Sequence, residues 1–152
     1  MYALVAAIDA KDSFTFQHST NVSQYAVLLA QKLGLPGDDI HTVKVAGLLH
    51  DIGKIGIPES ILKKAGKLTN EEYEIMKSHV QKSIEMIHYL PNMNYVIPAV
   101  VSHHERYDGK GYPRGLKGEG IPFLGRILAV CDSFDAMISK RAYKEALSVE
   151  YA

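Results

Sequence analysis

Residues 45–54 have the sequence VAGLLHDIGK. It begins as an unbroken apolar run, which is typical of a helix buried in a core. His50 and Asp51 close the run, at a position where a carboxylate without a partner would be costly to bury. A divalent cation bound by both side chains would remove this cost. The stretch therefore predicts a buried helix that ends at a metal site.

Apolar residues recur at helical spacing on both sides of this stretch. Turn and cap residues separate the segments: Gly34 is a natural helix stop, and Thr69 with Glu72 has the pattern of a capping box. Residues 106–120 hold five glycines and one proline, which is typical of a long structured loop. No segment has the pattern of a strand, so the sequence predicts an all-α bundle. The expected helices span about residues 18–33, 38–49, 58–62, 69 to at least 87, 93–105 and 122–138.

Two of these helices have a predicted core face, because their apolar side chains are three or four residues apart. The faces are Tyr73, Met76, Val80, Ile84 and Ile87 in the helix capped by Thr69, and Phe123, Ile127, Val130 and Phe134 in the last helix.

The composition is that of a soluble globular domain. The chain has 152 residues, 47% of them hydrophobic and 22% charged, which suits one domain with one core. Seventeen Lys and Arg offset 17 Asp and Glu, and this net charge of 0 argues against a protein that coats nucleic acid or an anionic membrane. No apolar run approaches the roughly 20 residues of a membrane span, and no signal peptide is apparent. With Cys131 as the single cysteine, the composition favours a cytoplasmic protein without disulfides.

Imidazoles and carboxylates are placed on or at the ends of the predicted helices, where a bundle can bring them together. Taken singly, each has an ordinary interpretation: a histidine bonded within the core, Asp51 capping a turn, or Asp132 paired with Arg126 or Lys140. His41 and His88 fit such ordinary roles. Seven separate ordinary roles explain the seven residues less well than one shared role does, so we predict a joint metal site. Its expected ligands are His18, His50, Asp51, His79, His103, His104 and Asp132.

Mixed imidazole and carboxylate ligands without a thiolate suit Fe, Mn, Zn, Co or Ni. More than four candidate ligands imply two metals, bridged by a carboxylate such as Asp51. Two metals close together are a common device for hydrolysis at phosphorus, because they activate water and neutralise the phosphate oxygens.

The motifs HDIGK at 50–54 and HHERYDGKGYP at 103–113, with His18 upstream and CDSFDAM at 131–137, resemble those of an HD-GYP domain. This is a branch of the HD phosphohydrolase superfamily. The resemblance extends from about Ala7 to Ser148. It implies a helical bundle with a Gly-rich GYP loop, and hydrolysis of cyclic di-GMP to pGpG or GMP at the output end of a bacterial signalling protein.

The resemblance also implies roles for individual residues. The superfamily pattern falls on His18, His50, Asp51 and Asp132, and the additional ligands of the branch on His79, His103 and His104. The metals are expected to be two divalent ions, Fe or Mn first, with Ni, Co and Zn as alternatives. Lys54 resembles a phosphate contact or proton donor, the alternative being a solvated loop lysine, and Asp51 and Asp135 are expected to act with it.

The GYP loop is expected to contact substrate. Glycines allow close backbone approach, and an Arg/Lys pair suits phosphate, although the same pattern could be a turn with solvated charges. Tyr112 could stack on guanine or serve as a packed anchor, and Glu105 is expected to orient a ligand histidine. The predicted substrate contacts are Lys54, Gly109, Gly111, Tyr112, Arg114 and Lys117.

Two departures from the family pattern carry expectations. Trinuclear members have a Glu four residues before the first ligand histidine, where this chain has Phe14, so we expect two metals and pGpG as the first product. The ends of the chain suggest one HD-GYP domain over residues 1–152, cut from a longer signalling protein and lacking its C-terminal helices. An N-terminal sensory or receiver domain would then precede it, and a homodimer is among the options.

Two other functions remain open from the sequence. One is hydrolysis of another cyclic dinucleotide, such as 3′,3′-cyclic GMP-AMP, or of a nucleotide. The other is a module that senses a dinucleotide or binds a partner without catalysis. The intact HDIGK and GYP motifs favour an enzyme.

Overall fold

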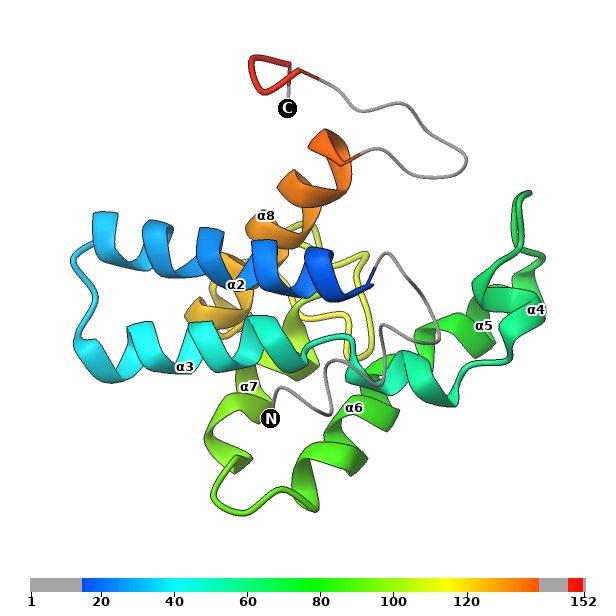
Figure 1. Cartoon of the computed structure of the whole chain (residues 1–152), viewed down its shortest axis with the longest axis horizontal. Coiled ribbons are helices and arrows are strands. Elements are labelled where there is room, and N and C mark those ends of the chain that lie inside the picture. Colours follow the sequence, from blue (N-terminus) through cyan, green and yellow to red (C-terminus); the bar gives the residue numbers. More distant parts are fainter. Residues whose placement is uncertain (1–14, 140–147, 152) are drawn as a thin grey trace.

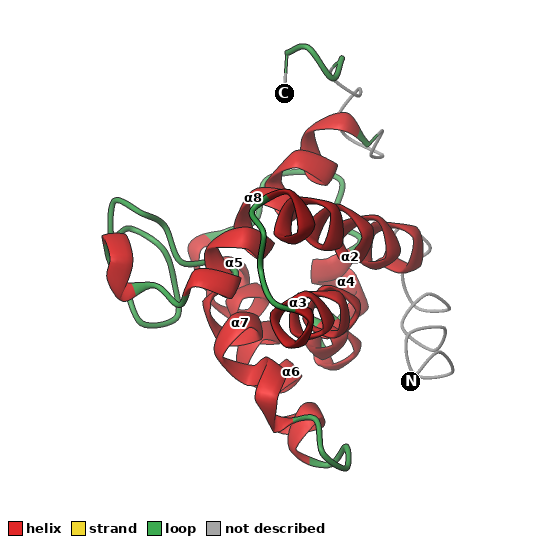
Figure 2. Ribbon diagram, turned by 90° about the vertical axis from the view of Figure 1, so that its left-hand side faces the viewer, coloured by secondary structure: helices red, strands yellow, loops and turns green. Residues whose placement is uncertain are grey.

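The computed structural model describes residues 15–139 and 148–151, and all its regular structure there is helical (Figures 1 and 2). This confirms the predicted all-α bundle. The α-helices are α2 (Thr15–Lys32), α3 (Gly37–Leu49), α4 (Glu59–Leu62), α5 (Asn70–Lys77), α6 (His79–His88), α7 (Ile97–Ser102) and α8 (Phe123–Ile138). Three short 3-10 helices join them: η1 (Ile52–Gly56), η2 (Asn94–Val96) and η3 (Gly118–Gly120).

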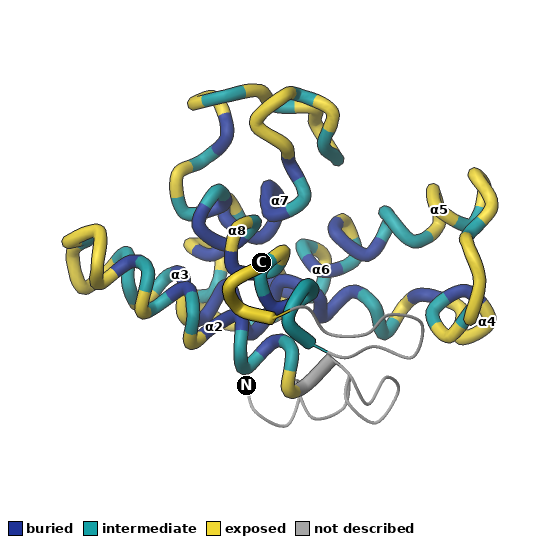
Figure 3. The backbone as a smooth tube through the Cα atoms, turned by 90° about the horizontal axis from the view of Figure 1, so that it is seen from above, coloured by how far each residue is buried: buried dark blue, intermediate teal, exposed yellow. Residues whose placement is uncertain are grey.

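An antiparallel pair of helices, α2 and α3, forms the centre of the bundle, and α7 and α8 pack on it (Figure 1). The pair is close because α3 carries Gly47, where a Cβ atom would lie 2.7 Å from the Cα of Ser23. The buried core between these helices includes Val22, Leu49, Val100 and Leu128. Burial is concentrated in the bundle, while α4, α5 and the connection from α7 to α8 are largely exposed (Figure 3).

The segment after Thr69 forms two helices where the spacing predicts one. The capping box is present: the Thr69 hydroxyl accepts from the Glu72 amide, and the Glu72 carboxylate accepts from the Thr69 amide. The helix then ends at Ser78, and α6 begins at His79. Because of this break the predicted stripe is not continuous. Val80 and Ile87 are buried, but Tyr73 is 47% exposed, so its predicted burial is wrong.

The core face of α8 includes Ile127 as predicted but differs from the prediction at two other positions. Val130 is 60% exposed and Phe123 44%, whereas Leu128, Cys131 and Asp135 are buried. These three positions, spaced by three and four residues, share one face of a helix. The helix turns this face inward, and the carboxylate of Asp135 thereby reaches a histidine of α2.

The segment expected as a helix over 93–105 is shorter, consisting of η2 and α7, with Pro98 in the first turn of α7. Among the described helices, none has both the length and the apolar character that crossing a bilayer requires.

Candidate metal centre

All seven predicted ligands meet at one place inside the bundle. The His18 Nε2 atom lies 3.0 Å from Asp132 Oδ1, which links α2 to α8. The two oxygens of Asp51 lie 3.4 Å from His50 Nε2 and 3.3 Å from His79 Nε2. His104 Nδ1 is 4.0 Å from the other oxygen of Asp132. His103 lies between its neighbours, with its ring centroid 5.0 Å from that of His50 and 4.0 Å from that of His104.

The donors form two groups that share one carboxylate. Asp51, His79, His103 and His104 form the first group, and His18, His50 and Asp51 the second, with the donor atoms of each group within 4.8 Å of one another. Asp132 adds a second carboxylate whose oxygens face His18, His50 and His104. A carboxylate shared by two sets of imidazoles is the arrangement expected of a bridging ligand.

Three of the histidines are held by the helix turns that precede them. The Nδ1 atoms of His50, His79 and His103 lie 2.8, 2.7 and 2.5 Å from the backbone carbonyls of Gly47, Met76 and Val100. A carbonyl can only accept, so Nδ1 carries the proton and donates it, and Nε2 keeps its lone pair. Such outer hydrogen bonds fix the tautomer that metal-binding histidines need.

Within residues 15–139 and 148–151, no group donates a hydrogen bond to the lone pairs of these histidines. His50 Nε2, His79 Nε2, His103 Nε2 and Asp51 Oδ1 are buried and lack a hydrogen bond. Unpaired acceptors buried together are strongly unfavourable, unless a cation binds them. The donor set is nitrogen and oxygen without sulfur, so the residues fit divalent transition-metal ions.

Electrostatics keeps most of the histidines neutral. Burial lowers the pKa of His103 well below its usual value, lowers that of His79, and lowers that of His104 to about 4. Neutral imidazole is the form that binds metal. Burial would raise the pKa of Asp51, but the Lys54 ammonium and the neighbouring histidine hold it well below its usual range, so the carboxylate is ionised.

His18 behaves differently because it lies between two carboxylates. Burial alone would lower its pKa, but hydrogen bonds to Asp132 and Asp135 outweigh burial and raise the pKa to about 9. Its Nδ1 atom is 2.6 Å from Asp135 Oδ2, and Asn21 donates to the other oxygen of Asp135 at 2.8 Å. Asp135 therefore fixes the orientation of His18.

Lys54 and Asp135, which are expected to act together, form hydrogen bonds with different residues. The Lys54 ammonium donates to Asp51 Oδ2 at 2.5 Å, at the inner side of η1, and its side chain is 24% exposed. This places Lys54 at the edge of the metal centre, as expected. Asp135 bonds His18 and Asn21, so its observed contacts are those of a support for a ligand. Asn21 is a site residue that the sequence analysis missed, although it shares a face of α2 with His18.

Ser83 is a second residue that the sequence analysis missed. Its buried hydroxyl accepts from the Gly53 amide at 2.8 Å and donates to the His50 carbonyl at 2.9 Å. The backbone of η1 lies so close to α6 that a Cβ atom on Gly53 would be 2.0 Å from the His79 carbonyl oxygen. The signal available from sequence was a small polar residue, four positions after His79, on a helix face that is otherwise apolar.

The GYP loop folds on itself around Glu105. The buried carboxylate of Glu105 accepts from the amides of Arg114 at 2.7 Å and Leu116 at 2.9 Å, so its observed role is to hold the loop and not to orient a histidine. Gly111 is needed here, because a Cβ atom would lie 2.3 Å from the Arg106 amide nitrogen. Gly109 has a φ of +82°, a conformation that favours glycine.

Three other predicted substrate contacts, Tyr112, Arg114 and Lys117, are part of this loop. Tyr112 packs on a metal-centre histidine, with its ring centroid 4.8 Å from that of His104, which matches the packed-anchor alternative. The side chains of Arg114 and Lys117 are exposed, and the stem of Lys117 lies beside Gly109.

Other predicted features lie away from the centre or outside the described residues. His41 stacks on Tyr95 with centroids 6.0 Å apart, and His88 contacts Asn94, so both have ordinary roles as expected. Phe14, from which we infer two metals, lies outside the described residues.

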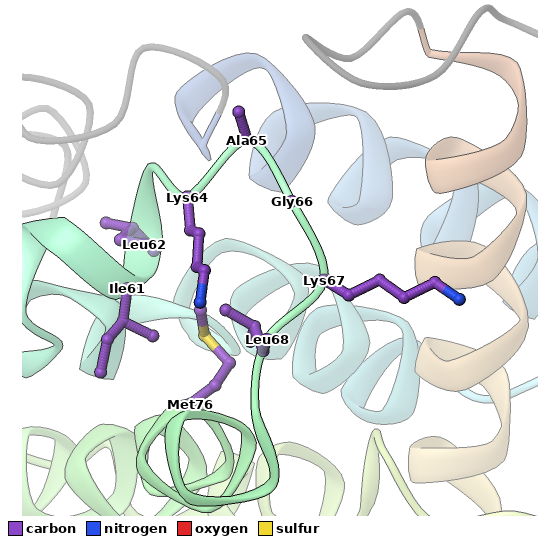
Figure 4. Close-up of a pocket in the computed structure, with 8 residues that line it drawn as sticks. All are labelled: Ile61, Leu62, Lys64, Ala65, Gly66, Lys67, Leu68 and Met76. Atoms are coloured by element: carbon purple, nitrogen blue, oxygen red, sulfur yellow. The ribbon is translucent and has the colours of Figure 1, made fainter.

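Two cavities are lined by residues other than the candidate ligands. One of about 540 Å³ lies between α4 and α5 and is lined by apolar side chains and the stem of Lys64 (Figure 4). Met76 lines this cavity, and its carbonyl accepts from His79. A second cavity of about 550 Å³ lies between the GYP loop and the outer face of α8, near Glu105 and Val130.

Comparison with known proteins shows where this arrangement recurs. Residues 3–152 match the family described as HD domain. The chain is 44% identical over 151 residues to the cyclic di-GMP phosphodiesterase response regulator RpfG of Xanthomonas campestris pv. campestris, and the match covers 98% of this chain and 40% of that protein. It is 40% identical over 147 residues to the 3′3′-cGAMP-specific phosphodiesterase 2 of Vibrio cholerae, covering 95% of this chain and 28% of that protein. The chain thus spans two fifths or less of the length of these relatives.

Solved structures support the same fold. A Bdellovibrio bacteriovorus HDG"Y"P protein matches with a TM-score of 0.67 at 23% identity, over 82% of this chain and 42% of that one. The HD domain of the L. monocytogenes phosphodiesterase PgpH, in complex with cyclic-di-AMP, matches with a TM-score of 0.68 at 22% identity, over 91% of this chain and 74% of that one. The solved structures thus support the fold, and the family match together with the relatives confirms the resemblance drawn from the motifs. Since the family match spans nearly the whole chain, this chain belongs to the HD domain family.

Proposed function

We propose that this chain is a metal-dependent phosphodiesterase that hydrolyses cyclic di-GMP. The observation that carries the proposal is Asp51, whose carboxylate is common to two groups of buried histidines with unpaired Nε2 atoms. The names of the relatives from Xanthomonas campestris and Thermotoga maritima, both cyclic di-GMP phosphodiesterases, support the substrate class.

Two divalent transition-metal ions, Fe or Mn first and Ni, Co or Zn as alternatives, would supply a water of lowered pKa and would neutralise phosphate charge. Asp51, His79, His103 and His104 would hold one ion, and His18, His50 and Asp51 the other, with Asp132 between them. The carbonyls behind the histidines keep each Nε2 directed inward, so the centre is organised before substrate arrives.

Lys54 is the catalytic cation of the proposal. Its ammonium lies on the shared carboxylate and is partly exposed, where it can face the substrate. A protonated amine there can stabilise charge on the leaving 3′ oxygen and donate a proton to it. Asp51 keeps Lys54 oriented, and Asp135 contributes by fixing His18.

The GYP loop would contact the rest of the substrate through Gly109, Gly111, Tyr112, Arg114 and Lys117. The exposed charges of Arg114 and Lys117 support a role in holding phosphate. With two metals, which the Phe14 departure favours, the first product would be pGpG, with GMP formed slowly or not at all.

A second candidate substrate is 3′3′-cGAMP, since Vibrio cholerae relatives at 40% and 41% identity are named as specific for it. The third candidate is a module that binds a dinucleotide without turnover. The proposal has three further parts: a receiver or sensory domain in the full-length protein, a homodimer and a cytoplasmic location. The response-regulator relative supports the first of these.

The test is anaerobic incubation of Mn²⁺- or Fe²⁺-loaded protein with cyclic di-GMP and, in parallel, with 3′3′-cGAMP, with products separated by HPLC. Formation of pGpG supports the proposal, and faster cleavage of 3′3′-cGAMP moves the assignment to the second candidate. Full metal content without turnover of either substrate would contradict catalysis. Asp51→Asn should abolish product formation. The control is His41→Ala, which should leave product formation unchanged because His41 is exposed and lies outside the centre.

A further inference from the structure

An exposed aromatic residue, Tyr73, lies beside the metal centre on a helix that contributes nothing to the core. None of the eight residues of α5 is fully buried, and Tyr73 itself is 47% exposed. Its ring lies 6.3 Å from that of Tyr112 at an interplanar angle of 81°. Since Tyr112 in turn packs on His104, two successive ring contacts connect an exposed tyrosine to a metal-centre histidine.

A lysine lies over both tyrosine rings. The Lys77 ammonium is 5.2 Å from the ring centroid of Tyr73 and 5.7 Å from that of Tyr112. Its side chain is only 25% exposed, and it forms an ion pair with the exposed Glu74 at 2.6 Å. A cation over two aromatic faces is favourable, and this contact holds the lysine beside Tyr112, the ring that packs on His104.

We propose that Tyr73, Lys77 and Tyr112 form a platform that binds one nucleobase of the substrate, with Tyr73 as the stacking ring. The proposal rests on the proposed function, because a phosphodiester at the metals would bring an attached base to the rim of the centre. A purine offers a large π-face for an exposed tyrosine. Guanine also presents two acceptors, N7 and O6, on one edge, where adenine presents an acceptor and a donor. Lys77 therefore favours guanine.

Fluorescence tests the platform directly, because the chain contains no tryptophan. Tyr73→Trp introduces a single indole at the platform. Stacking of guanine on this indole should quench its emission when GMP is added to the Mn²⁺-loaded protein, whereas ribose 5-phosphate, which lacks the base, should leave it unchanged. The matched control is Tyr89→Trp, at an 87% exposed tyrosine that follows the far end of α6, about 15 Å from the His79 end. Equal quenching by both compounds, or by neither, would overturn the proposal.

Kinetics gives a second measurement. Tyr73→Leu keeps an apolar side chain but removes the ring, so the KM for cyclic di-GMP should rise about tenfold with a much smaller change in kcat, which is the scale of one lost base stack. Tyr73→Phe should recover most of this loss. Lys77→Met should raise the KM for cyclic di-GMP more than that for cyclic di-AMP. Unchanged KM values in active Tyr73→Leu protein would contradict the platform.

The two proposals fail in different ways. Selective quenching by GMP in a protein that cleaves no cyclic dinucleotide would overturn the phosphodiesterase and retain the base platform. Turnover of cyclic di-GMP without selective quenching would retain the phosphodiesterase and overturn the platform.

Discussion

His18 in α2 donates through Nδ1 to Asp135 in α8, over a distance of 2.6 Å and a separation of 117 residues. The contact joins the two helices at the point where His18 enters the metal centre. Against the lowering effect of burial, the hydrogen bonds of His18 to Asp132 and Asp135 raise its pKa to about 9. The protonation state of the metal-free protein is therefore uneven across the ligands.

Metal binding should release about one proton per chain at pH 7.5. His18 is protonated in the metal-free protein at this pH, and its Nε2 must lose the proton to bind an ion. Metal affinity should consequently rise with pH up to about 9. Calorimetric titration of Mn²⁺ in buffers of different ionisation enthalpy measures the release. His18→Gln should remove it, while a wild-type titration that is independent of the buffer would show that His18 is already neutral.

The metal-free protein should lose stability as the pH falls from about 6.5 toward 4. The pKa values of His79, His103 and His104 are lowered by burial, so in this range the unfolded chain binds protons that the folded chain does not. Protons therefore favour the unfolded state. Thermal unfolding at a series of pH values, with and without Mn²⁺, measures the effect. A Tm of the metal-free protein that is flat over this interval would contradict the burial argument.

Asp51→Asn should reduce the bound metal from about two ions to one or none per chain, because one carboxylate serves both groups. Metal analysis after gel filtration gives the count. Asp38→Asn is the control, since Asp38 is exposed in the first turn of α3. Retention of two ions by Asp51→Asn would show that Asp51 does not bridge.

Gly111→Ala should destabilise the protein by about 1–3 kcal/mol, since the added methyl group would overlap the backbone of Glu105 and Arg106. The free energy of unfolding in urea measures this change. Gly66→Ala is a fair comparison, because a Cβ atom there meets nothing within 4 Å. Equal stability of the two variants would mean that the GYP loop relaxes without loss.

The sequence predicts that the seven candidate ligands come together, and the structure places the donor atoms of all but Asp132 in two groups that share Asp51, with Asp132 beside them. Asp51 alone could cap a turn, so the prediction depends on the whole set of imidazoles and carboxylates and on the HDIGK and GYP motifs. A helix start was also predictable where residues close in the sequence form the cap, as Thr69 and Glu72 do. The residues of this cap, Thr69 and Glu72, are close together in the chain, whereas the candidate ligands extend from His18 to Asp132.

The errors arise where tertiary contacts decide. Periodicity continues through Ser78, so it could not show that the helix ends there and leaves Tyr73 exposed. The face that α8 turns inward depends on the partner of Asp135 in another helix. Glu105 was predicted to act on a histidine, but its carboxylate satisfies loop amides that sequence alone does not bring near it.

The hydroxyl of Ser83, held between Gly53 and His50, joins η1 to α6. As a result, the proposed proton donor and a candidate metal ligand lie on two connected elements. Lys54 is part of η1, and His79 is the first residue of α6. A signal that shifts or tilts α6 would carry both groups together and keep their mutual spacing, while changing their position relative to His18 on α2. Control exerted through α6 would thus change the position of Lys54 and His79 relative to His18. The distance between Lys54 and His79 would stay the same.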